Sequence, residues 1–307
     1  MRLRALELFC GIGGFAAAMA GSGVQVAAAF DQSRVALNVY ALNFPAHGVR
    51  HADLERIDAD RLAAVAADLW WLSPPCQPYT VRGRRRDLDD PRARSLVRLL
   101  EILADLPPSR LPRYLAVENV PGFAASQARE VLTDRLRGRG YQVAETLLCP
   151  TELGVPSRRP RYYLVASRAG LVPRQPPYRR QQPLLSFLEP YEAGTSPAEL
   201  LLPAETVARF GSGLRILDVA DPSVYTTCFT AGYGRSLMHA GSFLRCSGGV
   251  RRFAPVEIAR LLGFPPGFRF PDELPLRKCW HLLGNSLSVT AVREVLGVLP
   301  ELELPRC

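Results

Sequence analysis

A glycine-rich turn near the start of the chain limits its possible folds more than any other feature. Residues 4–9 form a short apolar run that is typical of a buried strand, and residues 14–21 are small enough for a tightly packed helix. Between them, Gly11, Gly13 and Gly14 predict a sharp turn from strand to helix. Such a turn lets a ligand approach the backbone closely, although the same glycines also suit plain packing of the helix on the strand.

An acidic residue follows this turn at a spacing along the sequence that is typical of a ribose-binding acid. Asp31 ends a second expected strand and lies 17 residues after Gly14, where an acid can bind ribose hydroxyls. The spacing of the glycines is G-x-G-G, which differs from the G-x-G-x-x-G pattern of dinucleotide-binding proteins. The pattern therefore argues against a standard dinucleotide-binding motif and leaves two interpretations, a nucleotide-like ligand and plain packing of the helix on the strand.

Strand and helix signals alternate as far as about residue 166. Strands are expected at 24–30, 70–72, 114–117 and 161–166, and helices at about 35–42 and 93–104. The first helix is expected to bury Val35, Val39 and Leu42, and the second to bury Leu96, Leu99, Leu100 and Leu103. This alternation predicts an α/β fold with a largely parallel sheet.

The character of the sequence changes near residue 170. Prolines become frequent and the alternation weakens until about residue 250. Regular order returns at Ala254-Pro255, a helix start with proline in its first turn, and a last helix at about 288–299 is expected to pack on the first domain. We therefore expect a main domain at 1–169, a small irregular region at 170–250, and a return segment at 251–307 that completes the main domain.

Arginine dominates the charge of this 307-residue chain. Lys+Arg is 38 against 29 Asp+Glu, giving a net charge of +9, and Lys278 is the only lysine. Guanidinium groups suit phosphate, so a nucleic-acid partner is one interpretation of this excess. A GC-rich genome that codes arginine wherever it needs a cation is the other interpretation.

Several classes of protein do not fit the composition. Seven cysteines without a C-x-x-C pair, together with four histidines, argue against a zinc site or a disulfide framework and favour the reducing cytoplasm. No apolar run reaches the ~18–20 residues of a membrane span. The basic N-terminus resembles a signal peptide, but Glu7 and the glycines interrupt its apolar run, so a cytoplasmic location is expected.

A cysteine between prolines follows the strand expected at 70–72. Pro74 and Pro75 must end any regular element, which places Cys76 at the carboxyl edge of the sheet, where open α/β sheets bind ligands. Nearby guanidinium groups would favour a nucleophilic thiolate. The arginines that follow are Arg82, Arg84, Arg85, Arg86, Arg92 and Arg94. The alternatives are an inert buried thiol and a solvated arginine loop.

Two more polar motifs lie at strand ends. Glu118 follows the strand at 114–117, where a partly desolvated carboxyl group can keep its proton and donate to a ring nitrogen. The alternative for Glu118 is a helix cap or a surface acid. Arg159 and Arg161 alternate at the entry to the strand at 161–166, so they would point to the same side, as a clamp on a phosphate or a base requires.

Together these motifs resemble the cytosine-5 methyltransferases in kind and in order, from about residue 4 to 298. The matching motifs are Phe9-x-Gly11-x-Gly13-Gly14, Pro74-Pro75-Cys76-Gln77, Glu118-Asn119-Val120, Arg159-x-Arg161 and Gly284-Asn285-Ser286. The resemblance implies a Rossmann-like, S-adenosylmethionine-dependent methyltransferase fold with a mostly parallel central sheet. It also implies that 1–169 is the catalytic, cofactor-binding domain and that 170–250 is the target-recognition region.

Within this family the chain most resembles the branch that looks like DNA methyltransferases but modifies tRNA. Cys228-Phe229-Thr230 resembles the Cys-Phe-Thr signature of that branch. The chain departs from the pattern at Ser157, where the family has Gln, and at Tyr79, where the branch has Phe. These departures concern contacts with the base and leave the implied reaction unchanged.

The resemblance implies a role for each motif residue. Cys76 would add to C6 of cytosine, Glu118 would engage N3, Arg161 would hold the carbonyl of the base, and Arg159 would support the Cys76 loop and a nearby phosphate. The implied ligands of S-adenosylmethionine, whose product is S-adenosylhomocysteine, are Phe9, Gly11, Gly13, Gly14, Asp31, Asp53, Leu54 and Asn285. The residues expected to contact nucleic acid are Gln77, Arg82, Arg84, Arg85, Cys228, Phe229 and Thr230.

The implied substrate is tRNA, at the anticodon-loop cytosine-38 of tRNA-Asp. A monomer is expected, without a metal ion or a membrane. Two alternatives remain at this point: a DNA cytosine-5 methyltransferase of the restriction–modification type, and a non-catalytic relative that binds nucleic acid.

Overall fold

The computed structural model describes residues 2–80, 86–174, 179–190 and 197–302. The chain forms two compact units. Unit 1 comprises Met1–Leu148, Pro160–Pro176 and Ala291–Cys307, and unit 2 comprises Cys149–Arg159 and Pro177–Thr290. In the described part of the chain, no helix combines the length and apolar character that crossing a membrane requires.

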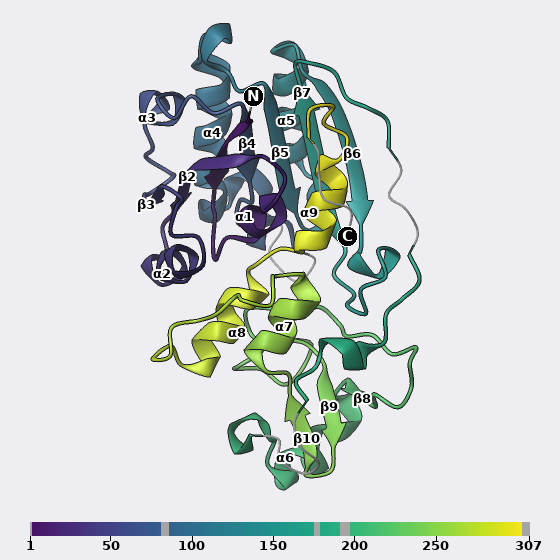
Figure 1. Cartoon of the computed structure of the whole chain (residues 1–307). Helices are drawn as coiled ribbons and strands as arrows, with labels where there is room; N and C mark the ends of the chain where they lie inside the picture. Colours follow the sequence, from purple (N-terminus) through teal and green to yellow (C-terminus); the bar gives the residue numbers. More distant parts are fainter. Residues whose placement is uncertain (1, 81–85, 175–178, 191–196, 303–307) are drawn as a thin grey trace. The chain divides into compact units, whose positions relative to one another are not determined.

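Unit 1 is built on a seven-stranded sheet of order β3-β2-β1-β4-β5-β7-β6 (Figure 1). Its strands are β1 (Arg4–Leu8), β2 (Gln25–Asp31), β3 (Val49–His51), β4 (Leu69–Leu72), β5 (Tyr114–Asn119), β6 (Gln142–Leu148) and β7 (Arg161–Ser167). The strands β3, β2, β1, β4 and β5 run parallel to one another. The strand β7 is antiparallel to both of its neighbours, β5 and β6. The prediction of a mostly parallel sheet is confirmed.

Helices cover both faces of this sheet because alternate side chains of each buried strand point to opposite sides. The helices of unit 1 are α1 (Gly14–Met19), α2 (Arg34–Asn43), α3 (Ala59–Ala63), α4 (Arg94–Asp105), α5 (Gln127–Gly138) and the Ala291–Leu296 part of α9 (Val289–Leu296). Leu6, Trp70 and Leu115 share a core with α3, α4 and α5. On the opposite face, the ring of Trp71 stacks on Phe15 of α1 at 5.2 Å.

The predicted apolar faces of two helices have different outcomes. In α4 the four leucines at 96, 99, 100 and 103 are buried, as their spacing predicts. In α2, Val39 is buried as predicted, but the predicted face is wrong at Val35, which is 37% exposed, because the helix also buries Ala36 and Tyr40. The buried stripe includes Tyr40 because its hydroxyl donates to the buried side chain of Glu7 at 2.8 Å, a contact that an apolar pattern does not reveal.

The last helix packs on α1 through Arg293, and of the expected return segment 251–307 only the part from Ala291 belongs to unit 1. Its guanidinium donates to the carbonyl oxygens of Ala18 at 2.8 Å and Ala17 at 3.1 Å. These carbonyls lie in the last turn of α1, where the usual i+4 amide donors run out, and Ala17 also accepts the Ala20 amide at 3.4 Å. The bond therefore caps α1 and fixes the helix that follows the glycine turn.

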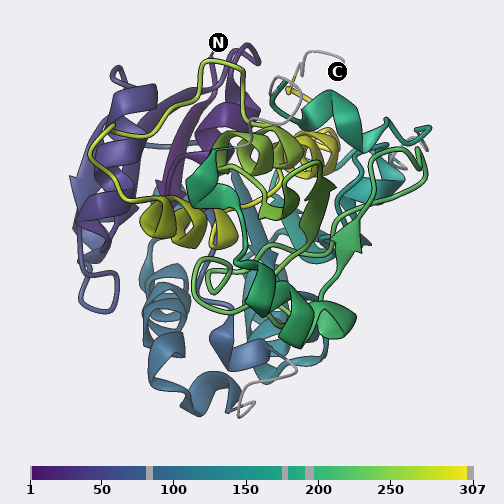
Figure 2. The same ribbon diagram turned by 90° about the horizontal axis from the view of Figure 1, so that it is seen from below.

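Unit 2 is a smaller mixed unit. It contains α6 (Ala204–Phe210), β8 (Ile216–Leu217), β9 (Phe243–Cys246), β10 (Gly249–Arg252), α7 (Pro255–Leu262) and α8 (Leu276–Gly284). The helix α7 begins at Pro255 after an Ala254 N-cap, as predicted, and lies beside α8 (Figures 1 and 2). Buried aromatic rings form much of its core: Phe229, Tyr233, Phe243, Phe253 and Trp280.

Candidate active site

Four predicted motifs lie at one edge of the unit 1 sheet. The glycine turn follows β1, Asp31 ends β2, the Cys76 segment follows β4, and Glu118 lies near the end of β5. Because β2, β1, β4 and β5 are adjacent and parallel, their carboxyl ends meet at the same edge. This is the edge at which open α/β sheets bind their ligands.

Two glycines of this turn differ in the space around them. Gly13 has a φ of +87°, and a Cβ there would lie 2.6 Å from the ring of Phe44, so a side chain does not fit. Gly11 has a φ of +52°, but nothing lies within 4 Å of the place where its Cβ would be. Gly13 is therefore required for packing on α2, whereas the backbone at Gly11 is accessible. Phe9 also has a positive φ, 57°, which is uncommon for a residue with a side chain.

Asp31 ties the end of β2 to this turn. Its Oδ2 accepts a hydrogen bond from the Gly11 amide at 2.8 Å, and its Oδ1 accepts one from the Ser33 amide at 2.7 Å. Burial raises the pKa of Asp31, while these amide bonds oppose that rise. Each carboxylate oxygen has a second lone pair, so Asp31 can still accept from a ligand hydroxyl.

A buried acid lies under the same turn. Glu7 is 1% exposed and accepts the Tyr40 hydroxyl at 2.8 Å as well as the amides of Phe15 and Ala16. Burial raises the pKa of Glu7 to about 8. The Tyr40 hydroxyl also lies 3.1 Å from Nδ1 of His47, so the acid is linked to a partly buried histidine. Sequence reasoning used Glu7 only as an interruption of an apolar run and missed this support.

The remaining predicted cofactor residues are placed differently from one another. Asp53 is exposed, and its Oδ1 accepts the amide of Glu55 at 3.0 Å. Leu54 is 4% exposed and belongs to the unit 1 core, so its side chain is mainly a packing element. Asn285 lies in unit 2, at the C-terminal end of α8. The predicted residues that the structure gathers around one turn are Phe9, Gly11, Gly13, Gly14 and Asp31.

Cys76 follows two prolines at the end of β4. It precedes a single 3₁₀ turn, η1 (Gln77–Tyr79), and the Tyr79 amide donates to the Cys76 carbonyl at 3.0 Å. Cys76 is partly buried and Gln77 is exposed. The prolines thus stop the strand and leave a compact turn that presents the thiol.

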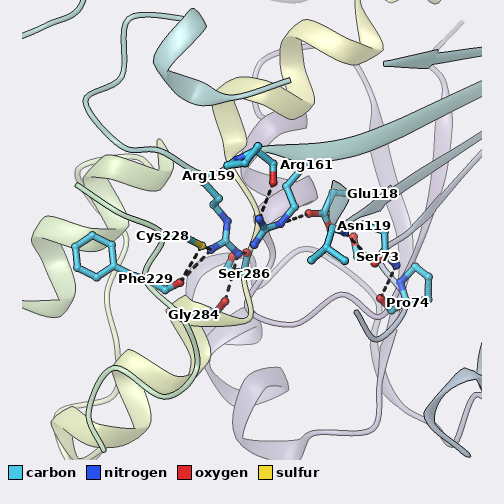
Figure 3. A network of polar contacts seen from close by, with 12 residues as sticks. Ser73, Pro74, Glu118, Asn119, Arg159, Arg161, Cys228, Phe229, Gly284 and Ser286 are labelled. Atoms are coloured by element: carbon cyan, nitrogen blue, oxygen red, sulfur yellow. Dashed lines mark hydrogen bonds and ion pairs between the residues drawn. The ribbon is translucent and has the colours of Figure 1, made fainter. Parts of the chain in front are cut away.

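Residues after Glu118 hold this turn in place. Nδ2 of the buried Asn119 donates to the Pro74 carbonyl at 3.2 Å (Figure 3). Gly122 packs directly on the Tyr79 carbonyl, where any side chain would overlap it. The ring of Phe123 contacts the ring of Tyr79 edge to face at 4.8 Å. Sequence reasoning missed Gly122 as a site residue, although Pro121-Gly122 directly after the Glu-Asn-Val motif was an available signal.

Glu118 forms an ion pair with Arg161. Nε of Arg161 lies 3.2 Å from Oε1 of Glu118, and the two side chains are 13% and 11% exposed (Figure 3). Arg161 also donates to the Pro160 carbonyl at 2.8 Å. The contact places Glu118 beside a guanidinium, a partner that its own motif does not reveal. Hydrogen bonding to N3 of a cytosine then needs a proton on Glu118 or on the base.

The strand alternation from which the clamp of Arg159 and Arg161 was predicted does not include Arg159. β7 begins at Arg161, so strand alternation does not extend to Arg159. Arg159 is 4% exposed in unit 2, where its guanidinium donates to Cys228 Sγ at 3.1 Å. It also bonds three backbone carbonyls, those of Phe229, Gly284 and Ser286 (Figure 3). Arg159 therefore joins two loops of unit 2 to each other.

The Cys-Phe-Thr motif is also mainly structural in its side chains. Phe229 is 4% exposed and packs on Tyr233 and Phe253, at 4.9 and 5.1 Å. Its ring is therefore not available to a nucleic acid, contrary to the prediction. Cys228 and Thr230 are partly buried. The hydroxyl of Thr230 accepts the amide of Gly232 at 3.3 Å.

The departure at Ser157 has a structural explanation. Ser157 is buried, and its hydroxyl accepts a hydrogen bond from Thr226 Oγ1 at 3.0 Å. The Arg158 amide donates to the Thr226 carbonyl at 2.8 Å, which extends the same contact. A short hydroxyl at position 157 thus fixes the segment that carries Arg159.

One arginine near Cys76, Arg92, is held by an acidic partner. Arg92 pairs with Asp90 at 2.7 Å, and this contact holds the pKa of Asp90 at about 2. Asp90 first, and then Cys76, raise the pKa of the Arg92 guanidinium. Arg92 is thus within electrostatic range of the thiol. The predicted nucleic-acid residues Arg82, Arg84 and Arg85 lie outside the described residues.

The described residues contain no group of three or more His, Cys, Asp or Glu side chains arranged to hold a metal ion.

Comparison with known proteins agrees with this arrangement. Residues 3–200 match the family model of the C-5 cytosine-specific DNA methylases. The human tRNA (cytosine(38)-C(5))-methyltransferase is 30% identical over 97% of this chain and 99% of its own length. The Dictyostelium discoideum DNA (cytosine-5)-methyltransferase is 29% identical over 97% of this chain and 94% of its own length. The crystal structure of the Schizosaccharomyces pombe Dnmt2 methyltransferase superposes with a TM-score of 0.84 at 29% identity, covering 98% of this chain and 99% of that one. The family model, the near full-length relatives and the sheet order together show that the chain is a member of the C-5 cytosine methyltransferase family.

Proposed function

We propose that this protein methylates C5 of a cytosine in tRNA, through a transient bond between Cys76 and the base. The observation that carries the proposal is the joining of the Cys76 turn to the end of β5. Asn119 bonds the Pro74 carbonyl at 3.2 Å, and Glu118 pairs with Arg161 at 3.2 Å in the same unit. A thiol, a carboxyl group that can hold or share a proton, and a guanidinium are the groups that attack on C6, contact with N3 and contact with the base carbonyl require.

The proposed reaction begins at the ring of the base. C5 of cytosine is too poor in electrons to take a methyl group unaided. The Cys76 thiolate adds to C6 while Glu118 hydrogen-bonds or protonates N3, and the electron pair released to C5 makes that carbon nucleophilic. After methylation, a base removes the C5 proton, the C5–C6 double bond re-forms, and the Cys76 sulfur leaves as thiolate. Arg92, which is fixed by Asp90, lies within electrostatic range to stabilise that charge.

The residues of the glycine turn fit S-adenosylmethionine, which supplies the methyl group when bound. The open space beside Gly11 gives a ligand access to the backbone, and Gly13 keeps the turn close to α2. Asp31 has lone pairs left for ribose hydroxyls after bonding the amides of Gly11 and Ser33. We assign Asn285 and the exposed Asp53 to the same ligand on the sequence resemblance.

We favour tRNA over DNA as the substrate. The human relative is named for cytosine-38 of tRNA, and the Cys228-Phe229-Thr230 motif resembles the tRNA-modifying branch. The target base must leave its stack to reach the thiol, and a loop base needs the least energy to do so. On this basis cytosine-38 in the anticodon loop of tRNA-Asp is the proposed target. The name of the Dictyostelium relative makes DNA the alternative to test.

Transfer of tritium-labelled methyl groups to tRNA-Asp and to duplex DNA, measured side by side, tests the proposal. We expect strong labelling of tRNA-Asp at cytosine-38 and little labelling of DNA. Cys76→Ala should lower the rate on tRNA by roughly 10⁴-fold or more while S-adenosylhomocysteine still binds. Cys246→Ala, which removes a partly buried cysteine of β9, is the matched control and should keep the activity. Labelling of DNA alone, or full activity of Cys76→Ala, would contradict the proposal.

A further inference from the structure

Two loops of unit 2 are joined along their backbones. Gly284 packs on the backbone of Thr230 and Ala231 so closely that no side chain would fit at position 284. The buried guanidinium of Arg159 donates to the carbonyls of Phe229 at 3.1 Å and Gly284 at 3.2 Å. The loop that carries the Cys-Phe-Thr motif therefore determines where the loop with Asn285 lies.

A histidine connects the same two loops. His281 lies one turn before Asn285 on α8, so the two side chains share a helix face. Its Nδ1 is 3.2 Å from the Ala231 carbonyl oxygen, and its Nε2 is 3.3 Å from Nδ2 of Asn285. A carbonyl only accepts, so Nδ1 carries the hydrogen, and Nε2 of the neutral ring then accepts from the Asn285 amide.

This contact determines the orientation of an exposed amide. Asn285 is exposed, and an exposed side chain without a fixed partner loses rotational freedom when it binds a ligand. The bond to His281 directs one N–H of Asn285 back to α8. The Oδ1 and the other N–H of Asn285 are left for a ligand.

We propose that His281 is a positioning residue that holds the side-chain amide of Asn285 ready for S-adenosylmethionine. Its own ring is oriented by the Ala231 carbonyl, next to the Cys-Phe-Thr motif. This inference rests on the proposed function, because it takes Asn285 as a cofactor-binding residue. It assigns the motif a part in cofactor binding, through the backbone of Ala231.

Binding of S-adenosylhomocysteine to the full chain, measured by calorimetry, tests this assignment. His281→Leu should weaken binding roughly five- to tenfold, the size expected for one hydrogen bond. The KM for S-adenosylmethionine should rise by a similar factor while kcat changes little. His281→Gln should restore binding to within about twofold, because one amide supplies both the donor and the acceptor. Lys278→Leu, at an exposed position of the same helix, is the control and should bind as the wild type does.

A double-mutant cycle separates positioning from general stability. In an Asn285→Ala background, His281→Leu should weaken binding by less than about twofold, because its effect passes through the missing amide. Full additivity of the two changes would overturn the inference. So would a His281→Leu protein with a lower melting temperature and unchanged affinity, or a His281→Gln protein as weak as His281→Leu. If the wild-type chain itself does not bind S-adenosylhomocysteine, the proposed function fails, and the inference fails with it.

Discussion

Gly122 lies against the carbonyl oxygen of Tyr79, with no room for a side chain between them. This contact joins the segment after Glu118 to the turn that begins at Cys76. Any residue larger than glycine must push the two segments apart, and the thiol moves with one of them. The position of Cys76 relative to Glu118 therefore depends on the absence of a side chain at position 122.

Gly122→Ala should lower both stability and activity. Overpacking of this kind costs about 1–3 kcal/mol in free energy of unfolding, and displacement of the thiol should lower kcat by at least roughly tenfold. Urea unfolding and steady-state methyl transfer measure the two effects. Gly138→Ala is the matched control, since nothing lies within 4 Å of the Cβ position at the exposed end of α5. Equal behaviour of the two variants would contradict the contact.

Tyr79→Phe should keep activity and stability, or raise stability slightly. The Tyr79 hydroxyl is buried and has no hydrogen-bond partner among the described residues, so its removal ends a desolvation cost of about 1 kcal/mol. Tyr162→Phe is the matched comparison, because Tyr162 also packs on Phe123 but donates to Glu145 at 2.7 Å. That variant should lose about 1 kcal/mol in thermal or urea unfolding. A larger loss in Tyr79→Phe than in Tyr162→Phe would refute this assignment.

The buried Glu7 should make stability depend on pH. Its pKa is raised from 4.5 to about 8 in the fold, so between these values the folded chain holds a proton that the unfolded chain has released. Stability from this residue is present below pH 4.5 and decreases up to pH 8, by about 1.4 kcal/mol per pH unit at most. Glu7→Gln removes this dependence. The difference in unfolding free energy between wild type and Glu7→Gln should shift in favour of the variant from pH 5 to 8, and parallel profiles would disprove it.

Removing Arg161 alone should harm the protein more than removing the whole ion pair. Both side chains are nearly buried, so Arg161→Ala leaves the Glu118 charge without its guanidinium partner and should cost about 3 kcal/mol. Arg161→Ala combined with Glu118→Gln should recover part of that loss. Both proteins should be inactive in methyl transfer. A double variant less stable than Arg161→Ala would show that the pair is not coupled as described.

The sequence predicted the fold where local patterns decide it. The apolar spacing of α4 and the Pro255 start of α7 depend on neighbouring residues alone, and both predictions are confirmed. The face of α2 was predicted only in part, correctly at Val39 and wrongly at Val35, because Tyr40 is buried by a bond to Glu7, 33 positions away. The strand β6 gave no clear signal, because it lies at the edge of the sheet with several exposed or partly exposed side chains.

In the candidate site, too, local motifs were predictable and contacts between residues far apart in the chain were not. The motifs around Gly11, Cys76 and Glu118 were found from the sequence because each lies at or just after the end of a buried strand. The partners of Arg159 were not predictable, since Phe229 and Gly284 lie 70 and 125 positions away in the chain. Pairing of Arg161 with Glu118 was also hidden, because nothing in either motif shows that β7 lies antiparallel beside β5.

Covalent trapping tests the central claim most directly. A tRNA-Asp that carries 5-fluorocytosine at position 38 cannot lose its C5 substituent as a proton, so the bond between Cys76 and C6 should persist after methylation. With S-adenosylmethionine present, we predict a complex that survives denaturing electrophoresis and maps by mass spectrometry to Cys76, and no complex with Cys76→Ala. Absence of the complex from a wild-type protein that methylates ordinary tRNA, or attachment through another side chain, would contradict the account.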